Sequence, residues 1–156
     1  MEANDNSAPT YYNSLYRHGV DEKRRVQVPA MWRPAKAGIE FTLILWPKDK
    51  EGPCLRVLPP EEMAELMKSI DAMPNSDPNK VVLKRFIGSE SVQVALDKAG
   101  RICLPEEMSK AAGIGIGDEA VLVGLLDRFE IWNPGRFEKV RAADAVMAQE
   151  AFKMME

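Results

Sequence analysis

One nine-residue stretch organises the whole chain: Asp97-Lys98-Ala99-Gly100-Arg101-Ile102-Cys103-Leu104-Pro105. An earlier stretch, Asp21-Glu22-Lys23-Arg24-Arg25-Val26-Gln27-Val28-Pro29, has the same form, and its Asp, Arg and Pro recur at an offset of 76 residues. In both copies the segment between Arg and Pro is apolar, then polar or small, then apolar. This pattern predicts a tight charged turn that leads into a short strand, which the proline ends.

The segments around the two turns follow one order, which predicts an internal repeat. Each repeat is expected to contain a strand, the charged turn, a short strand, a short helix, a β-hairpin and a longer helix. Neither repeat has enough apolar residues to close a core alone, so the two should share a core about a pseudo-twofold axis. The predicted divisions are a flexible tail at 1–11, a first repeat at 12–77 and a second repeat at 78–156.

Apolar runs and turn residues place the individual elements. Strands are predicted within 12–20 (with Leu15 facing inward), 39–46, 54–58, 91–96, 120–126 and 129–132, the last with alternating exposure. A short helix should follow Pro29, interrupted or reshaped by Pro34 and ending near Gly38, and another should span 105–112 with Gly113 as its cap. Segment 81–86 is predicted to be helical or extended.

Two longer helices are predicted from their caps and apolar spacing. Pro59-Pro60 should open a helix whose buried face is formed by Met63, Leu66, Met67 and Ile70. Asn133-Pro134 has the form of a cap and first helical residue, and the helix that follows has a narrow apolar stripe of Phe137, Val140 and Met147.

Composition limits the class of protein. With 46% hydrophobic and 29% charged residues, the 156-residue chain is typical of a globular protein. No apolar run approaches a membrane span, and the polar N-terminus lacks the features of a signal peptide, so we expect a cytoplasmic protein. Cys54 and Cys103 lack the spacing of a metal site, which predicts a reduced, mostly buried pair.

The net charge of -3 argues weakly against a nucleic-acid partner, but the distribution of charge favours one. Segment 17–36 has six basic and two acidic residues, and 80–101 has five basic and two acidic residues. Segment 102–156 has six basic and ten acidic residues. Basic charge therefore gathers near both turns, either as an ordinary solvated face or as a surface for an anionic partner.

No catalytic, cofactor or metal motif is evident. The glycines of 113–117 follow a predicted helix and precede a strand, whereas a dinucleotide-binding loop follows a strand and opens a helix. His18 is the single histidine and has no second ligand nearby. Acidic residues cluster at helix starts, where the helix dipole explains them. We therefore expect neither an enzyme nor a resident cofactor.

The two turns are the remaining candidates for function. In each, an Asp precedes an Arg by four residues, so that the carboxylate can hold the guanidinium or the turn backbone in one geometry. One interpretation is an exposed ion pair of little consequence. The other is that Asp21 and Asp97 orient Arg25 and Arg101 toward phosphate or a guanine edge, for which the planar guanidinium is suited.

The chain resembles the MraZ family of bacterial transcriptional regulators, which are built from two units of the AbrB (SpoVT/AbrB) type. The resemblance lies in both turns and is clearest in 96–105, 119–124 and 128–132, and with the repeat order it covers residues 12–140. It implies an α+β fold, a double AbrB-like swapped-hairpin β-barrel with a pseudo-twofold internal repeat and flanking helices. It also implies ring-like homo-oligomers that bind tandem repeats in promoter DNA.

By the family pattern, such a ring would repress the division and cell-wall gene cluster from the nucleoid. DNA contacts would come from Lys23, Arg25, Lys98 and Arg101, with Arg24 as an additional contact. Two departures stand out. Arg24 occupies the position where the second turn has Gly100, at a cost on the order of 1 kcal/mol if that position requires positive φ, so the first turn could differ in shape. Tyr12-Asn13-Ser14 replaces an aromatic-x-Gly start.

An alternative function is that of a protein-binding module of antitoxin or adaptor type, because antitoxins of similar fold bind a toxin through a disordered tail. Segment 142–156 is predicted to be helical rather than disordered, which weighs against this alternative.

Overall fold

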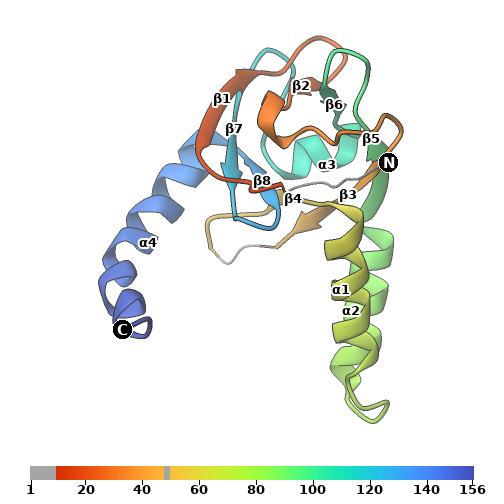
Figure 1. Cartoon of the computed structure of the whole chain (residues 1–156), viewed down its shortest axis with the longest axis vertical. Coiled ribbons are helices and arrows are strands. Elements are labelled where there is room, and N and C mark those ends of the chain that lie inside the picture. The colour runs from red at the N-terminus through yellow and green to blue at the C-terminus, as the bar shows by residue number, and fades with distance from the viewer. Residues whose placement is uncertain (1–9, 48–49) are drawn as a thin grey trace, which may run out of the picture.

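The computed structural model describes residues 10–47 and 50–156, which form a mixed α+β fold as predicted (Figure 1). The first repeat contains β1 (Leu15–Gly19), β2 (Arg25–Gln27), the 3₁₀ helix η2 (Ala30–Trp32), β3 (Glu40–Trp46), β4 (Cys54–Leu58) and α1 (Pro60–Asp71). The second contains α2 (Pro78–Ser89), β5 (Ser91–Ala95), β6 (Arg101–Cys103), α3 (Glu106–Ala111), β7 (Glu119–Gly124), β8 (Phe129–Trp132) and α4 (Pro134–Lys153).

The main sheet interleaves the two repeats. Its order is β1-β7-β8-β4-β3-β5, so the first strand of each repeat pairs with the hairpin of the other repeat. Exchanging equivalent strands (β1 with β5, β3 with β7, β4 with β8) reverses this order and leaves the sheet unchanged. All pairings in the sheet are antiparallel. The strand order is therefore symmetric about its centre, as a pseudo-twofold relation between the two predicted repeats would require.

A second, two-stranded sheet joins β2 to β6, one strand from each repeat. Its central pair is Val26 and Ile102, which are equivalent residues of the two repeats, and both are fully buried. The pseudo-twofold axis therefore passes between these two side chains. The charged turns precede β2 and β6, so this pairing places the turns beside each other.

One apolar core serves both repeats. Trp32 of the first repeat packs against Phe129 of the second, with ring centroids 4.9 Å apart, and Tyr12 and Phe41 also contact Phe129. Val26, Val28, Ile102 and Leu104 connect the small sheet to this core. Aromatic contacts across the repeats explain why a single repeat would leave large apolar side chains uncovered.

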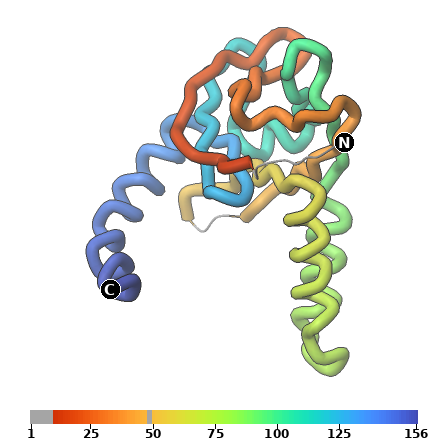
Figure 2. Tube along the Cα trace, in the orientation of Figure 1, coloured from red at the N-terminus to blue at the C-terminus, as the bar shows by residue number. Residues whose placement is uncertain are grey.

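The longer helices leave the body of the molecule as two separate arms, one formed by α1 and α2 and the other by α4 (Figures 1 and 2). The predicted buried face of α1 is only partly buried, because Met67 remains 55% exposed and only Ile70 is buried. In α4, Phe137 and Val140 are buried, but Met147 is 69% exposed. Both stripes extend beyond the body, so the prediction of a buried face on α1 was wrong for Met67.

The remaining sequence predictions have mixed outcomes. Helix α2 occupies segment 81–86, Asn133 caps α4 by accepting from the Arg136 amide at 3.0 Å, and 113–117 forms a loop between α3 and β7. Strand β8 is buried at all four residues and does not alternate, because α4 and the core cover its two faces. Cys103 is exposed rather than buried.

Differences at element ends have local causes. The helix after Pro29 ends at Trp32, since Pro34 lacks the amide that would continue it. Strand β7 ends at Gly124, and Leu126 takes a φ of 74° in the turn that follows. Leu15 is half-buried, whereas Tyr12 and Val20 are buried at the ends of this segment. Of the predicted tail 1–11, residues 1–9 lie outside the described part. No helix among the described residues is long and apolar enough to span a membrane.

Candidate nucleic-acid interface

The second charged turn is held together by Asp97. One oxygen of its carboxylate accepts hydrogen bonds from the backbone amides of Ala99 and Arg101, both at 2.9 Å. The other oxygen accepts from Nε of Arg101 at 2.9 Å. Two backbone bonds, from the Gly100 amide to the Asp97 carbonyl and from the Asp97 amide to the Arg101 carbonyl, close the turn.

The first turn has the same hydrogen bonds. Asp21 accepts from the amides of Lys23 and Arg25 at 2.9 and 2.8 Å, and its other oxygen accepts from Nε of Arg25 at 2.8 Å. These bonds favour the ionised carboxylate, so the amide of Arg25 lowers the pKa of Asp21, as the amide of Arg101 lowers the pKa of Asp97. Each Asp therefore holds both its turn and its arginine through hydrogen bonds.

Arg24 and Gly100 share a left-handed backbone, with φ of 58° and 80°. The position does require positive φ, so Arg24 carries a conformational cost on the order of 1 kcal/mol that Gly100 avoids. Because the hydrogen bonds of the two turns match, the substitution does not change the shape of the first turn. Ser14, at the other departure from the family pattern, also has a positive φ of 81°.

Contacts between the turns lock them into one surface. Nη1 of Arg101 lies 3.9 Å from the Asp21 carboxylate, so this carboxylate faces both arginines. The Gln27 side chain donates to the Ala99 carbonyl at 2.8 Å. Backbone bonds from Val28 to Gly100 and from Leu104 to Arg24 extend the β2–β6 pairing. The relative position of Arg25 and Arg101 is therefore fixed by the fold.

The predicted basic residues differ in how free they are. Lys23 and Lys98 are exposed, and neither forms an ion pair with a described carboxylate. Arg25 and Arg101 use Nε for their own turns, and their terminal nitrogens make no hydrogen bond to the described residues. Arg24 instead lies 3.5 Å from Glu106, which also pairs with Lys110 at 3.1 Å. This pairing weakens Arg24 as a contact for an external anion.

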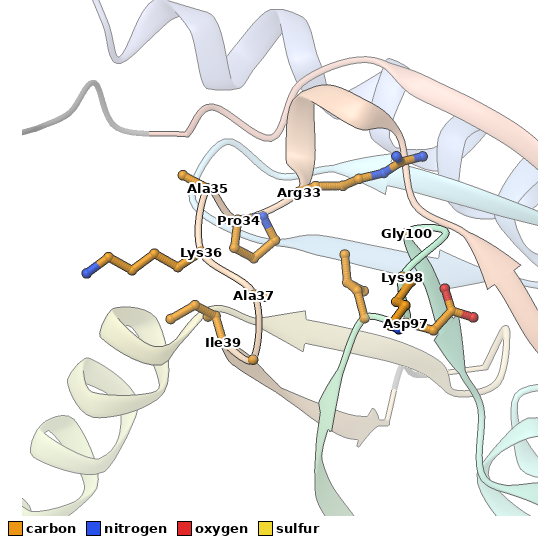
Figure 3. Close-up of a pocket in the computed structure, with 11 residues that line it drawn as sticks. Arg33, Pro34, Ala35, Lys36, Ala37, Ile39, Asp97, Lys98 and Gly100 are labelled. Atoms are coloured by element: carbon orange, nitrogen blue, oxygen red, sulfur yellow. The ribbon is translucent and has the colours of Figure 1, made fainter.

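Two residues that the sequence did not single out complete this surface. Gln27 links the turns, and Arg33 packs over Gly100 from the loop after η2 (Figure 3). Arg33 belongs to the basic segment 17–36, but nothing in its spacing indicated contact with a turn 67 residues away. No group of acidic, cysteine or histidine residues in the described part has the arrangement of a metal site.

The fold and the site define a class of protein: two interleaved β repeats that present a pair of Asp-oriented arginine turns on one surface.

The family model described as "MraZ protein, putative antitoxin-like" matches residues 87–154. Three curated relatives bear the name Transcriptional regulator MraZ. That of Roseiflexus castenholzii is 33% identical over 82% of this chain and 85% of its own length. Those of Rickettsia rickettsii and Clostridium tetani are 34% and 31% identical, over 88% and 90% of this chain and 91% and 94% of their own lengths. The chain belongs to the MraZ family, a family of transcriptional regulators and not of enzymes.

Proposed function

We propose that this protein is a transcriptional regulator that binds double-stranded promoter DNA through its two charged turns. The observation that carries the proposal is the β2–β6 pairing, which holds Arg25 and Arg101 side by side with their terminal nitrogens available. Lys23 and Lys98 flank them as exposed cations that form no ion pair with a carboxylate of residues 10–47 or 50–156, and they are suited to phosphate. The guanidiniums are suited to bidentate contacts with guanine or phosphate.

The finer parts of the proposal come from the family resemblance. The exchange of first strands between repeats supports a double AbrB-like swapped-hairpin barrel. We further propose a ring-like homo-oligomer that binds tandem promoter repeats of the division and cell-wall gene cluster, acts as a repressor, and resides in the cytoplasm at the nucleoid. Apolar side chains exposed on both helical arms support self-association, since such surfaces are costly in water.

The direct test is a binding titration against promoter DNA of that cluster at low and physiological salt. Arg25→Ala and Arg101→Ala should each weaken binding at least about fivefold while the oligomer stays intact, because one base contact contributes about 1–3 kcal/mol. Lys68→Ala is the matched control, since it removes one positive charge from α1, outside the turns. Equal binding by all four proteins would refute the role of the turns.

Multivalency gives a second test. One pair of turns makes few contacts, so a ring should bind several repeats in register far more tightly than one repeat. Comparison of DNA with one and with three repeats measures this directly. Equal affinity for both would contradict binding by a ring.

The alternative, a protein-binding module of antitoxin or adaptor type, is favoured by the exposed apolar faces of α2 and α4. The helical form of α4 weighs against a toxin-binding disordered tail. A pull-down that recovers one stoichiometric small protein, with no retention of DNA, would favour this alternative.

A further inference from the structure

A pocket of about 320 Å³ lies directly beside the second turn. Asp97, Lys98 and Gly100 line one side, and the loop after η2, residues 33–39, lines the other (Figure 3). Its cations are Arg33, Lys36 and Lys98, and its single carboxylate is that of Asp97. Because Asp97 already accepts two amides and the Arg101 Nε, its charge is compensated by its own turn.

Arg33 is held in place from three sides. Its Nε donates to the Val28 carbonyl at 2.9 Å, the preceding Trp32 is fully buried, and the following Pro34 restricts the backbone of Arg33 itself. The guanidinium covers Gly100, where the added Cβ of any other residue would overlap it. Gly100 is therefore buried, and the glycine makes room for an arginine from the other repeat.

Unlike the other arginines at the turns, Arg33 has no ion pair with a described carboxylate. Arg25 and Arg101 pair with Asp21 and Asp97, and Arg24 pairs with Glu106. The Arg33 Nε is satisfied by the Val28 carbonyl, whereas its terminal nitrogens make no hydrogen bond to the described residues. A half-buried, pre-positioned guanidinium with free donors is suited to an external anion.

At the equivalent place of the first turn, the arginine is in the turn and the small residue comes from the other repeat. There the turn residue is Arg24, and the residue equivalent to Arg33 is Ser109, which is buried and donates to the Ile114 carbonyl. Each turn thus has one extra guanidinium. At the first turn it belongs to Arg24 of the turn itself, and at the second turn it belongs to Arg33 of the other repeat. Of these two extra guanidiniums, that of Arg24 pairs with Glu106, whereas that of Arg33 has no ion pair with a carboxylate in the described part of the chain.

We propose that this pocket binds a phosphate group of the DNA backbone, held by Arg33 and Lys98, and so extends the contact of the second turn beyond Arg101. The inference rests on the proposed DNA-binding function. It makes the two turns unequal, with the stronger phosphate contact at the second turn. A contact to phosphate fixes the position of the turn on the duplex and carries no sequence information.

The test measures the dependence of DNA affinity on salt for wild type, Arg33→Gln, Arg33→Lys and Arg24→Gln, on promoter and unrelated DNA. Loss of one phosphate contact reduces the slope of log affinity against log salt by about 0.9. Arg33→Gln should lower the slope by about this amount per bound protomer and weaken binding equally on both DNAs. Arg33→Lys should retain most of the slope, and Arg24→Gln should change it less than Arg33→Gln does.

Several outcomes would overturn the inference, and they are distinguishable. If wild type does not bind DNA, the proposed function itself fails. If wild type binds and the slope of Arg33→Gln is unchanged, only the pocket assignment fails. If Arg33→Gln does not fold, Arg33→Met provides the same slope measurement, because it also removes the charge of Arg33 and leaves the turn cations unchanged. Saturable calorimetric binding of inorganic phosphate, abolished in Arg33→Gln without a change of slope, would assign the pocket to free phosphate.

Discussion

Single aspartates determine the form of this candidate site more than the arginines do. Asp21 and Asp97 each accept two backbone amides and one guanidinium, so each carboxylate is bound on both oxygens. The ion pair itself is exposed and contributes little. The bonds to the amides are what define the turn, and they are stronger when the carboxylate is ionised.

Asp97→Asn tests this role through pH. Since the folded pKa of Asp97 is lowered, its carboxylate stabilises the fold above the unfolded pKa of about 4 and loses that contribution as pH falls through the lower folded value. The variant should unfold at a lower temperature than wild type at pH 7, and the difference should shrink below pH 4. Thermal unfolding between pH 2 and 7 measures this. Glu138→Gln, on the exposed face of α4, is the control, and an equal loss in the control would exclude a special role for Asp97.

Removal of the glycine from the second turn and introduction of a glycine into the first turn test the two left-handed positions. Gly100→Ala should destabilise the protein by about 1–2 kcal/mol, because alanine is strained at a φ of 80° and its Cβ also displaces the Arg33 guanidinium. Arg24→Gly should change the free energy of unfolding by less than about 1 kcal/mol, because relief of strain offsets the entropy that glycine gains in the unfolded chain. Urea denaturation of both variants measures the contrast. Similar losses in both would mean that the two turns are not built as described.

Among secondary-structure elements, the order within each repeat was predictable and the pairing between repeats was not. Prolines 29, 59, 105 and 134 and the runs around Leu43 and Leu122 mark helix starts and strands locally. No local signal indicates that β1 pairs with β7 rather than with its own hairpin. That exchange follows from burial over the whole molecule, which only the two repeats together achieve.

The site was predictable to the same extent. The repeated Asp and Arg could be found from spacing alone, because their hydrogen bonds lie within five residues of chain. Arg33 could not be found, because its contact with Gly100 depends on the exchange of elements between repeats. The exposure of Cys103 likewise follows from the register of β6 opposite β2, where it faces Arg25.

The pairing of β4 with β8 contains a charged pair on the pseudo-twofold axis. Arg56 lies directly opposite Glu130 in the strand register. The pairs on either side, Leu55 with Ile131 and Val57 with Phe129, are related by exchange of the two repeats, so Arg56 and Glu130 occupy equivalent positions. Nη2 of Arg56 lies 2.6 Å from Glu130, and Trp132 donates to the other Glu130 oxygen at 2.8 Å. If the two repeats were identical in sequence, the same residue would stand at both of these positions, and two like charges would face each other. Opposite charges therefore favour pairing of the first repeat with the second over pairing of like repeats.

Charge reversal tests whether the Arg56–Glu130 ion pair favours pairing of the two different repeats. Glu130→Arg should cost about 3–5 kcal/mol, because it leaves two largely buried arginines facing each other. The double variant Arg56→Glu with Glu130→Arg should recover most of that loss, and urea denaturation of the three proteins measures it. If the double variant is no more stable than the single one, the axis pair does not select the pairing.

In the whole molecule, the turns and the helical arms have separate roles. The arms contribute little to the shared core, yet they carry most of the large exposed apolar side chains of the described residues. These are Met67, Val81, Val82, Leu83 and Phe86 on the first arm, and Val146, Met147 and Phe152 on the second. On α2, Lys84 pairs with Asp71 and Ile87 is buried toward α1, so Val82 and Phe86 lie on the opposite, outward face. A single chain leaves this face uncovered.

Phe86→Glu tests whether this face assembles copies of the chain. If α2 contacts a neighbouring protomer, a buried charge there should break the oligomer into smaller species, as measured by sedimentation. Affinity for DNA with one repeat should stay within about twofold, because the turns are untouched, whereas the gain from three repeats should disappear. Ser76→Glu, an equal charge at the exposed connection between α1 and α2, should leave both properties intact. An unchanged oligomer with Phe86→Glu would move the assembly contact away from α2, and loss of single-repeat binding would show that the arms and turns are not independent.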